Sequence, residues 1–276
     1  DISFNYYVKT KTDNTVVVVK YMKNGVMTEE TLTEFVEYTA GGRYAGKYVF
    51  RGITPQMIGR DITVVYTDGE AHDIIENYSV ADYLEKAYTN ANNTQVTKQL
   101  AADVMYYGLA AMKYRKADEA DIADIQSRIT KFGMTQSNVE MTDTSVREGE
   151  TIVYVSVRFD NANNLVFAVK DSVFEENPSY KYYIGKTEIT EWNTTLIEGY
   201  HVYTCEALKA IEYVGKTFTV KVYRADEVLQ TLTTDVGSYC ARIAASQTYA
   251  TELKELAKAT YAYGTSASAY ANRSNG

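Results

Sequence analysis

The chain has 276 residues, of which 45% are hydrophobic and 23% are charged, a composition typical of globular protein. Its net charge of -8 argues against a surface that follows nucleic-acid phosphates or an anionic membrane. The longest apolar run, Val16 to Val19, is too short to span a bilayer. Tyrosine is unusually common, with 26 Tyr against 8 Phe and 1 Trp, which favours half-buried strands and contact surfaces.

The first part of the chain reads as β-strands. The pattern is alternating or rich in β-branched residues, and Asp13-Asn14 is a natural turn between the first two strands. The predicted strands are Ile2–Lys9, Thr15–Met22, Lys47–Phe50 and Asp61–Tyr66.

The period then changes to that of a helix. Leu100, Val104, Tyr107 and Ala111 form an apolar stripe at helical spacing. The polar stretch Asn90–Gln95 precedes them and predicts a break between two antiparallel helices.

A short linking helix is expected over Lys116–Gly133. Asp118 and Glu119 near its start, and Arg128 near its end, suit the helix dipole. A metal site could use the same acidic residues, but the dipole and a solvated face explain them more simply.

The same pattern recurs later in the chain. Tyr107 matches Tyr263, Gly108 matches Gly264, and the step of 156 also relates Ile62-Thr63-Val64 to Phe218-Thr219-Val220. Further upstream the step falls to 153 between Tyr48 and His201, and to 150 between Val17–Lys20 and Phe167–Lys170. A repeat this long indicates duplication of a whole domain.

The second copy is predicted to contain the same elements. Asp160–Asn164 is its first turn, and Ser246–Thr251 separates its two helices. Its predicted strands are Thr151–Phe159, Asn164–Lys170, His201–Leu208 and Lys216–Tyr223.

The predicted fold class is therefore α+β, with two tandem repeats. Each repeat is expected to be an antiparallel β-sandwich followed by an antiparallel helical hairpin. The domain boundaries are 1–115 for the first module, 116–136 for the linking helix and 137–276 for the second module.

Two Tyr-Gly pairs, Tyr107-Gly108 and Tyr263-Gly264, lie on the predicted buried stripes of the helices. Glycine inside a helix costs about 1 kcal/mol relative to alanine. We therefore expect these four residues to serve helix packing by allowing a close backbone approach.

The two repeats differ at their beginnings. If Ile2 corresponds to Ile152, the segment Ser137–Val146 is an additional strand without a counterpart in the first repeat. The first sandwich would then have an open edge, which must be covered or paired. The C-terminal tail of a neighbouring subunit, Thr265–Gly276, is a candidate strand donor.

No catalytic constellation is apparent. His72 and His201 are the only histidines, and they fall in a turn-like region and a strand that nothing in the sequence brings together. Phosphate-binding and nucleophile motifs are absent from the sequence, while a distant pair of carboxylates is not excluded by spacing alone. We expect a protein that is not an enzyme and has no cofactor and no metal.

Cys205 and Cys240 are the only cysteines. Cys240 replaces Leu84 of the first repeat at a core position, and Cys205 ends a strand on which that helix could pack. Both a disulfide and a pair of buried thiols fit this placement.

Trp192 is the only tryptophan, and the first repeat has no tryptophan in the corresponding region. Together with tyrosines it could form a platform on which sugars stack. A role in the core or in an interface is the alternative.

Several stretches resemble a known type of module: residues 2–21, residues 47–66, residues 78–87 and residues 100–114. That module has the pattern N-F-Y-V, Y-V-F, Y-S-V-x-D-Y and Y-G-A-A-A-Q-x-Y, and occurs in secreted and surface proteins of anaerobic Gram-positive gut and rumen bacteria. Met112 replaces the glutamine of this pattern, and the segment that usually precedes N-F-Y-V is missing before Asp1. The resemblance implies an extracellular, noncatalytic setting and transfers no site residues.

The function expected from the sequence is that of an extracellular or cell-surface structural protein. Copies of the chain would assemble into a fibre or surface layer through strand addition. The alternative is a carbohydrate-binding or adhesion module with a polysaccharide ligand. Asp1 as the first residue fits either a processed N-terminus or an excised fragment.

Overall fold

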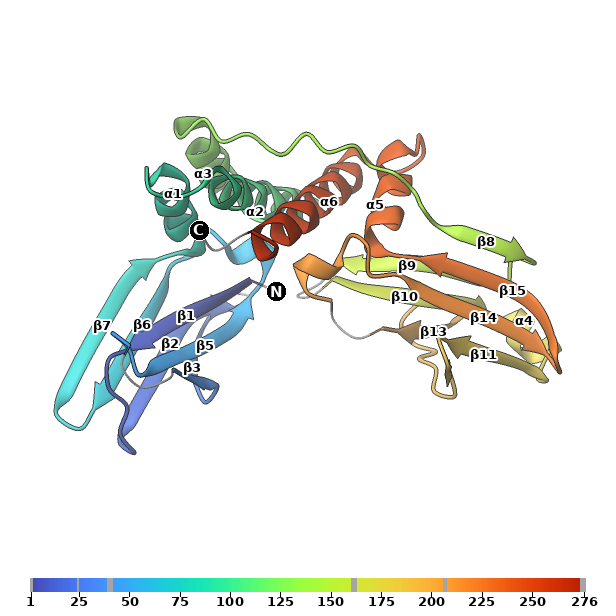
Figure 1. The fold of residues 1–276 in the computed structure, drawn as a ribbon, viewed down its shortest axis with the longest axis horizontal. Coiled ribbons are helices and arrows are strands. Elements are labelled where there is room, and N and C mark those ends of the chain that lie inside the picture. Colours follow the sequence, from blue (N-terminus) through green and yellow to red (C-terminus); the bar gives the residue numbers. More distant parts are fainter. Residues whose placement is uncertain (1, 24, 39–41, 160–162, 206–207, 274–276) are drawn as a thin grey trace. The chain divides into compact units, whose positions relative to one another are not determined.

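The computed structural model describes residues 2–23, 25–38, 42–159, 163–205 and 208–273 (Figure 1). The chain is a mixed α+β protein with antiparallel sheets, which confirms the predicted class at this level. It divides into two compact units, Asp1–Thr135 and Gln136–Gly276.

The first unit begins with two antiparallel sheets, in the strand orders β1-β5-β4 and β3-β2-β6-β7. Their strands are β1 (Ile2–Val8), β2 (Thr15–Lys23), β3 (Val26–Thr31), β4 (Phe35–Glu37), β5 (Gly46–Ile53), β6 (Ile62–Asp68) and β7 (Ala71–Tyr78).

The core of the first unit follows from the alternation along β2. Val17, Val19 and Tyr21 are buried, because residues two apart share one face of a strand. The ring of Tyr21 lies 4.9 Å from the ring of Phe50 on β5. The two sheets thus pack on each other through these side chains.

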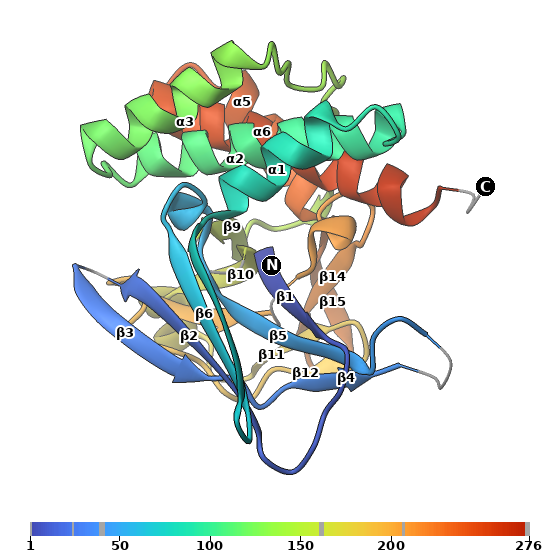
Figure 2. The ribbon, with the colours of Figure 1, turned by 90° about the vertical axis from the view of Figure 1, so that its left-hand side faces the viewer.

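Three helices follow: α1 (Val80–Thr89), α2 (Gln95–Tyr114) and α3 (Glu119–Lys131). They lie together at one end of the strands of this unit (Figures 1 and 2). The predicted break between the first two helices is confirmed, since Asn90 to Thr94 separate them.

Helix α3 matches the expectation from its charges. The side chain of Asp118 accepts a hydrogen bond from the backbone N–H of Ala120, which caps the N-terminus, and Arg128 and Lys131 lie in the last turn. The helix packs on α2 and belongs to the first unit, so the segment expected to link two modules is part of one of them.

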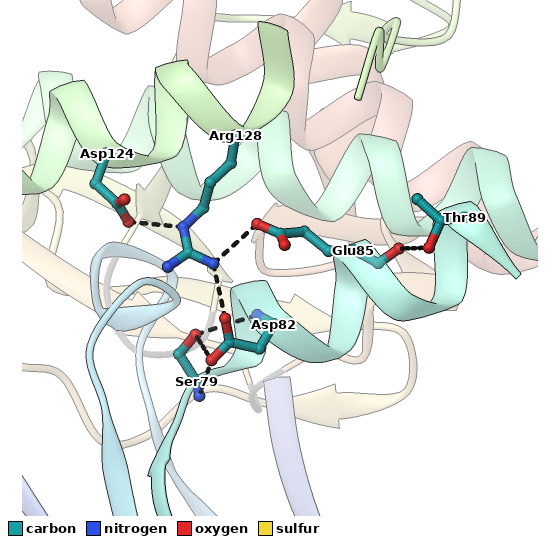
Figure 3. A network of polar contacts seen from close by, with 6 residues as sticks. All are labelled: Ser79, Asp82, Glu85, Thr89, Asp124 and Arg128. Carbon is teal, nitrogen blue, oxygen red and sulfur yellow. Dashed lines mark hydrogen bonds and ion pairs between the residues drawn. The ribbon is translucent and has the colours of Figure 1, made fainter. Parts of the chain in front are cut away.

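An ion-pair network fixes α3 against α1 (Figure 3). The guanidinium of Arg128 donates to Asp82 and Glu85 on α1, and to Asp124 on its own helix, each at 2.8 Å. Asp82 also forms a capping box with Ser79 at the start of α1. Three carboxylates therefore share one arginine, which ties the two helices together.

Gly108 of α2 packs against the short 3₁₀ helix η1 (Pro55–Met57) and the residue after it. A Cβ at Gly108 would overlap the side chain of Ile58, whose Cγ1 would be 2.7 Å away, and would lie 3.0 Å from the carbonyl oxygen of Pro55. Ile58 is fully buried, so the overlap would have to be relieved inside the core. The close approach is thus between a helix and a 3₁₀ turn.

We expect Gly108→Ala to destabilise the first unit by about 1–2 kcal/mol. Alanine favours a helix by about 1 kcal/mol, but overpacking a core typically costs about 1–3 kcal/mol. Thermal unfolding followed by circular dichroism measures the change. The second substitution Ile58→Val, which removes the overlapping methyl group, should restore part of the loss; an unchanged or higher midpoint for Gly108→Ala alone would contradict the packing argument.

The second unit also contains two antiparallel sheets, in the orders β13-β10-β9 and β12-β11-β14-β15-β8. Their strands are β8 (Val146–Gly149), β9 (Val153–Phe159), β10 (Asn163–Lys170), β11 (Tyr180–Ile184), β12 (Thr187–Glu188), β13 (Tyr200–Thr204), β14 (Phe218–Arg224) and β15 (Glu227–Thr234).

The helices of the second unit are α4 (Asp171–Glu176), α5 (Val236–Ala245) and α6 (Thr251–Ala271), with the 3₁₀ helix η2 at Ala210–Glu212. Helices α5 and α6 pack on each other. A Cβ at Gly264 of α6 would lie 2.9 Å from the Cβ of Tyr213 and 3.3 Å from the carbonyl oxygen of Ala210. This glycine therefore faces η2 and the residue that follows it.

Three details differ from the sequence predictions. Residues 17–20 and 167–170, which match in sequence at a step of 150, lie in sheets of different size: β2 pairs with β3 and β6 in a four-stranded sheet, whereas β10 pairs with β9 and β13 in a three-stranded sheet. Alternation identifies a strand but not its neighbours, so the match between these two short stretches did not predict equivalent strands. The second unit starts its first strand only at Val146, and Thr265–Ala271 of the expected donor tail is part of α6.

Of the predicted turn Asp160–Asn164, residues 160–162 lie outside the described residues, and β10 already begins at Asn163. Within the described ranges, no helix combines the length and apolarity that crossing a bilayer requires.

Candidate functional site

In the first unit, each of the two sheets has an edge strand without an outer neighbour among the described residues. β7 is the last strand of one sheet, β1 is the last strand of the other, and neither has an outer neighbour within the described residues. Backbone N–H and C=O groups along such edges can pair with a further strand.

In the second unit the corresponding edges are covered. β15 pairs with β14 as β7 pairs with β6, and β10 pairs with β13 as β1 pairs with β5. β8 adds to β15, and β9 adds to β10. Because β8 and β9 are consecutive in the chain, one continuous segment covers both edges.

The crossing between these two strands requires a glycine. Gly149 has a φ of +80°, and a Cβ there would overlap the carbonyl group of Leu229 on β15. The next residue, Glu150, donates its backbone N–H to that same carbonyl at 2.9 Å. The segment therefore passes in direct backbone contact over the edge of β15.

Gln230 anchors the segment after the crossing. Its side chain is 1% exposed, and its Oε1 accepts hydrogen bonds from the backbone N–H groups of Ile152 at 3.0 Å and Val153 at 2.7 Å. Buried N–H groups need an acceptor, so this one side chain fixes the start of β9.

Asp73 occupies the same ladder position in the first unit. It stands opposite Tyr66 on β6, as Gln230 stands opposite Val222 on β14, and 222 − 66 = 156 is the step of the sequence repeat. Asp73 is exposed, and its Oδ2 accepts a hydrogen bond from the hydroxyl of Tyr6 on β1 at 3.3 Å. The carboxylate thus reaches from one uncovered edge strand to the other.

Burial, together with the charge of Asp73 and the hydrogen bond to it, raises the pKa of Tyr6 to about 12. The phenol is therefore neutral at physiological pH and acts as a donor to the carboxylate. This contact holds Asp73 in place without neutralising its charge.

The backbone of Ile74 faces the open side of β7. Asp68 and Ala71 close a two-residue hairpin, so they form a hydrogen-bonded pair, and alternation makes Tyr66 and Asp73 the next hydrogen-bonded pair. The N–H and C=O of Ile74 consequently point away from β6. The side chain of Ile74 is 51% exposed.

The β6–β7 hairpin is acidic. Its charged residues after Tyr66 are Asp68, Glu70, Asp73 and Glu76, and the stretch from Tyr66 to Tyr78 contains no lysine or arginine. Two such edges would repel each other if they paired. A strand that adds here should be neutral or basic.

Trp192, predicted as a sugar platform, lies in an aromatic cluster of the second unit. Its half-buried ring stands edge-on to Phe174 at 5.3 Å and to Tyr182 at 5.1 Å. Phe174 also stacks on His201 at 4.1 Å, and Nδ1 of His201 lies 2.9 Å from Oδ1 of Asp171. The neighbours of Trp192 in this cluster are thus aromatic side chains of the same unit.

Cys205 and Cys240 are free in the structure, and both are buried. Burial raises the pKa of Cys205 to about 12 and raises the pKa of Cys240 as well. Both groups therefore remain thiols at neutral pH, the second of the two arrangements that the sequence left open.

The Tyr-Gly pairs are at helix-packing positions. Tyr107 and Tyr263 are both buried, and the ring of Tyr263 lies edge-on to that of Tyr213 at 6.1 Å. Burial raises the pKa of Tyr263 to about 12. The glycines that follow them approach η1 and η2 as described above.

The two histidines lie in different units. His72 lies on β7 of the first unit, rather than in the turn that was expected, and His201 lies on β13 of the second unit. Across the described parts of the chain, no three His, Cys, Asp or Glu residues form a group that could hold a metal ion.

No protein-family model matches the chain, and no curated protein matches its sequence.

Proposed function

We propose that this chain is a noncatalytic structural subunit whose first unit takes up a β-segment from a neighbouring polypeptide of a surface assembly. The observation that carries the proposal is the difference between the units. One continuous segment covers β15 and β10, whereas β7 and β1 have no outer neighbour within the described residues. Strand addition at such an edge gives affinity through main-chain hydrogen bonds.

The two units are, in this proposal, copies of one sandwich-and-hairpin module. Reading β1, β2, β3, β5, β6 and β7 against β10, β11, β12, β13, β14 and β15 keeps the order along the chain and the pairing of each strand. This correspondence leaves β8, β9 and the short helix α4 as additions to the second unit. An incoming segment would supply the counterparts of β8 and β9 to the first unit.

The donor is taken, in this proposal, to be a segment of another polypeptide. Within the described residues, each chain has one β8–β9 segment, which already covers its own second unit. The expected donor tail is helical as far as Ala271. A polymer of identical chains would therefore require the β8–β9 segment to exchange between copies.

An extracellular setting is part of the proposal and is supported by the resemblance to bacterial surface modules. The excess of tyrosine and the net charge of -8 fit a contact-rich surface protein. The absence of a catalytic role is likewise proposed.

Ile74→Pro tests the proposed uptake. Proline removes the outward N–H of Ile74, and proline is tolerated on an edge strand when this N–H faces solvent. We expect the variant to keep its unfolding midpoint but to lose assembly with neighbouring subunits. Light scattering and negative-stain microscopy of a surface-protein fraction that contains the chain and its neighbours measure this assembly.

Thr231→Pro is the matched control, because Thr231 on β15 is paired with Glu148 on β8. This variant should destabilise the second unit by about 1–3 kcal/mol, since it breaks an existing ladder. Assembly that survives Ile74→Pro unchanged would remove the basis of the proposal.

A hollow on the second unit favours carbohydrate binding as a second function. Its volume is about 630 Å³, and its lining includes Tyr183, Tyr223, Lys181 and Asp226, with the two tyrosine rings 5.4 Å apart. Aromatic and polar groups of this kind can bind a sugar ring. Retardation in polysaccharide gels should be lost in Tyr223→Ala and kept in Trp192→Ala.

A further inference from the structure

We propose that Asp73 is the anchor of a specific peptide-binding site, and that the ligand is a strand–glycine–strand segment of a second polypeptide. The carboxylate would accept the two backbone N–H groups with which this segment begins its second strand. The inference rests on the proposed strand uptake and specifies its ligand and its central contact.

The second unit provides the template for the ligand. There, β8 runs along β15, Gly149 allows the backbone to cross, and β9 continues along β10. The side chain of Gln230 receives the N–H groups of Ile152 and Val153 directly after the crossing. A segment that bridges two edges of one module therefore needs a glycine and an acceptor at fixed places.

The first unit supplies the acceptor at the matching place. Tyr6 stands opposite Tyr48 on β5, as Val169 stands opposite His201 on β13, and 201 − 48 = 153 is a step of the sequence repeat. Val169 is also the ladder partner of Val153. The hydrogen bond from Tyr6 to Asp73 thus holds the carboxylate where the first residues of a β9-like strand would pair.

A carboxylate suits two N–H donors at least as well as an amide does. Both of its oxygens accept, and hydrogen bonds to a charged acceptor are about twice as strong as neutral ones. Gln230 also donates weakly, from Nε2 to the carbonyl oxygen of Val153 at 3.4 Å, which Asp73 cannot do. The site therefore recognises the N–H groups of the ligand.

Charge narrows the choice of ligand. Arg147 of β8 donates from Nη1 to the carbonyl oxygen of Val153 at 2.9 Å and so links the two strands of the template. An arginine at this place in the ligand would also lie near the acidic edge formed by Asp73 and Glu76. A second copy of β7 has the opposite character, because it would bring these carboxylates together.

A synthetic peptide with the sequence of residues 144–159 is the probe. Fluorescence anisotropy of the labelled peptide, titrated with the full chain, should show saturable binding that Ile74→Pro abolishes. Asp73→Ala should weaken binding by about tenfold or more, as expected for loss of charge-assisted hydrogen bonds. Asp73→Gln, which copies the second unit, should retain most of the affinity.

Two controls separate the anchor from general effects. Glu70→Ala removes a nearby charge in the hairpin turn and should leave binding unchanged; a peptide with Gly149→Val should not bind. Equal binding to Asp73→Ala and the unmodified chain would overturn the anchor, while loss in Ile74→Pro would still support strand uptake. A peptide that fails to bind the unmodified chain would overturn the ligand proposed here, whereas the proposed function is judged separately by assembly of the Ile74→Pro variant.

Discussion

Replacing Gln230 with leucine is expected to lower the free energy of unfolding of the second unit by about 3 kcal/mol. The substitution leaves the backbone N–H groups of Ile152 and Val153 without their acceptor in a site that is 1% exposed. Each unsatisfied buried group costs about 1–3 kcal/mol. The leucine fills a similar volume, so the loss reports the hydrogen bonds rather than a cavity.

Denaturant unfolding followed by tryptophan fluorescence measures this effect. Trp192 is the only tryptophan and belongs to the second unit, so its signal reports that unit. Gln247→Leu makes the same chemical change at an exposed position between α5 and α6 of the second unit and should alter stability by less than about 0.5 kcal/mol. A Gln230→Leu protein as stable as its parent would mean that β9 is held by its ladder alone.

Arg128→Ala is expected to destabilise the first unit by about 2–3 kcal/mol at neutral pH. The side chains of Arg128, Asp82 and Glu85 are 24%, 26% and 19% exposed, so the carboxylates would lose their partner in a partly desolvated place. Removing one member of a buried pair is costly because the other charge stays behind. Far-UV circular dichroism should detect the loss, while the Trp192 transition should not change.

This deficit should depend on pH. Burial raises the pKa of Asp82, but hydrogen bonds from Arg128 and Ser79 outweigh it and hold the pKa below its usual range. A lowered pKa in the folded state contributes stability above the unfolded value of about 3.9, and this is lost as pH falls through the folded value. The parent and Arg128→Ala should therefore differ less at pH 3 than at pH 7.

Arg51→Ala serves as the matched control for Arg128→Ala. Arg51 also donates two hydrogen bonds to one carboxylate, that of Glu34, but both side chains are about half exposed. Such pairs contribute little because water and salt screen them. If Arg128→Ala behaved like Arg51→Ala, α3 would be held by its buried Ile125 and Ile129 rather than by the network.

Local elements were predictable because their signals are local. The apolar stripe around Tyr107, the polar break after Thr89 and the charges of α3 each depend on residues a few positions apart. The additional strand predicted over Ser137–Val146 was wrong in its bounds, because the first strand of the second unit starts only at Val146. The sequence did not identify β7, β11 or β15, whose polar and charged residues hide the alternation.

The candidate site was predicted only as an open edge. The sequence did not single out Asp73 as a site residue. Its role depends on its ladder partner Tyr66, on its hydrogen bond with Tyr6 and on the absence of a described neighbour along β7. One signal was present: Asp73 falls within a position of Gln230 once the repeat is laid out at a step of 156. Without the ladders, neither residue could be recognised as an anchor.

The sequence by itself determined the α+β class, the places of the helices and many of the strands, since side-chain periodicity encodes which face of an element is buried. Tertiary structure alone decided which strands are neighbours, that β8 pairs with β15 and β9 with β10, and that residues 265–271 continue a helix. The physical reason is that strand pairing uses backbone groups common to nearly all residues. Partners far apart in the chain are therefore selected by the packing of the whole unit.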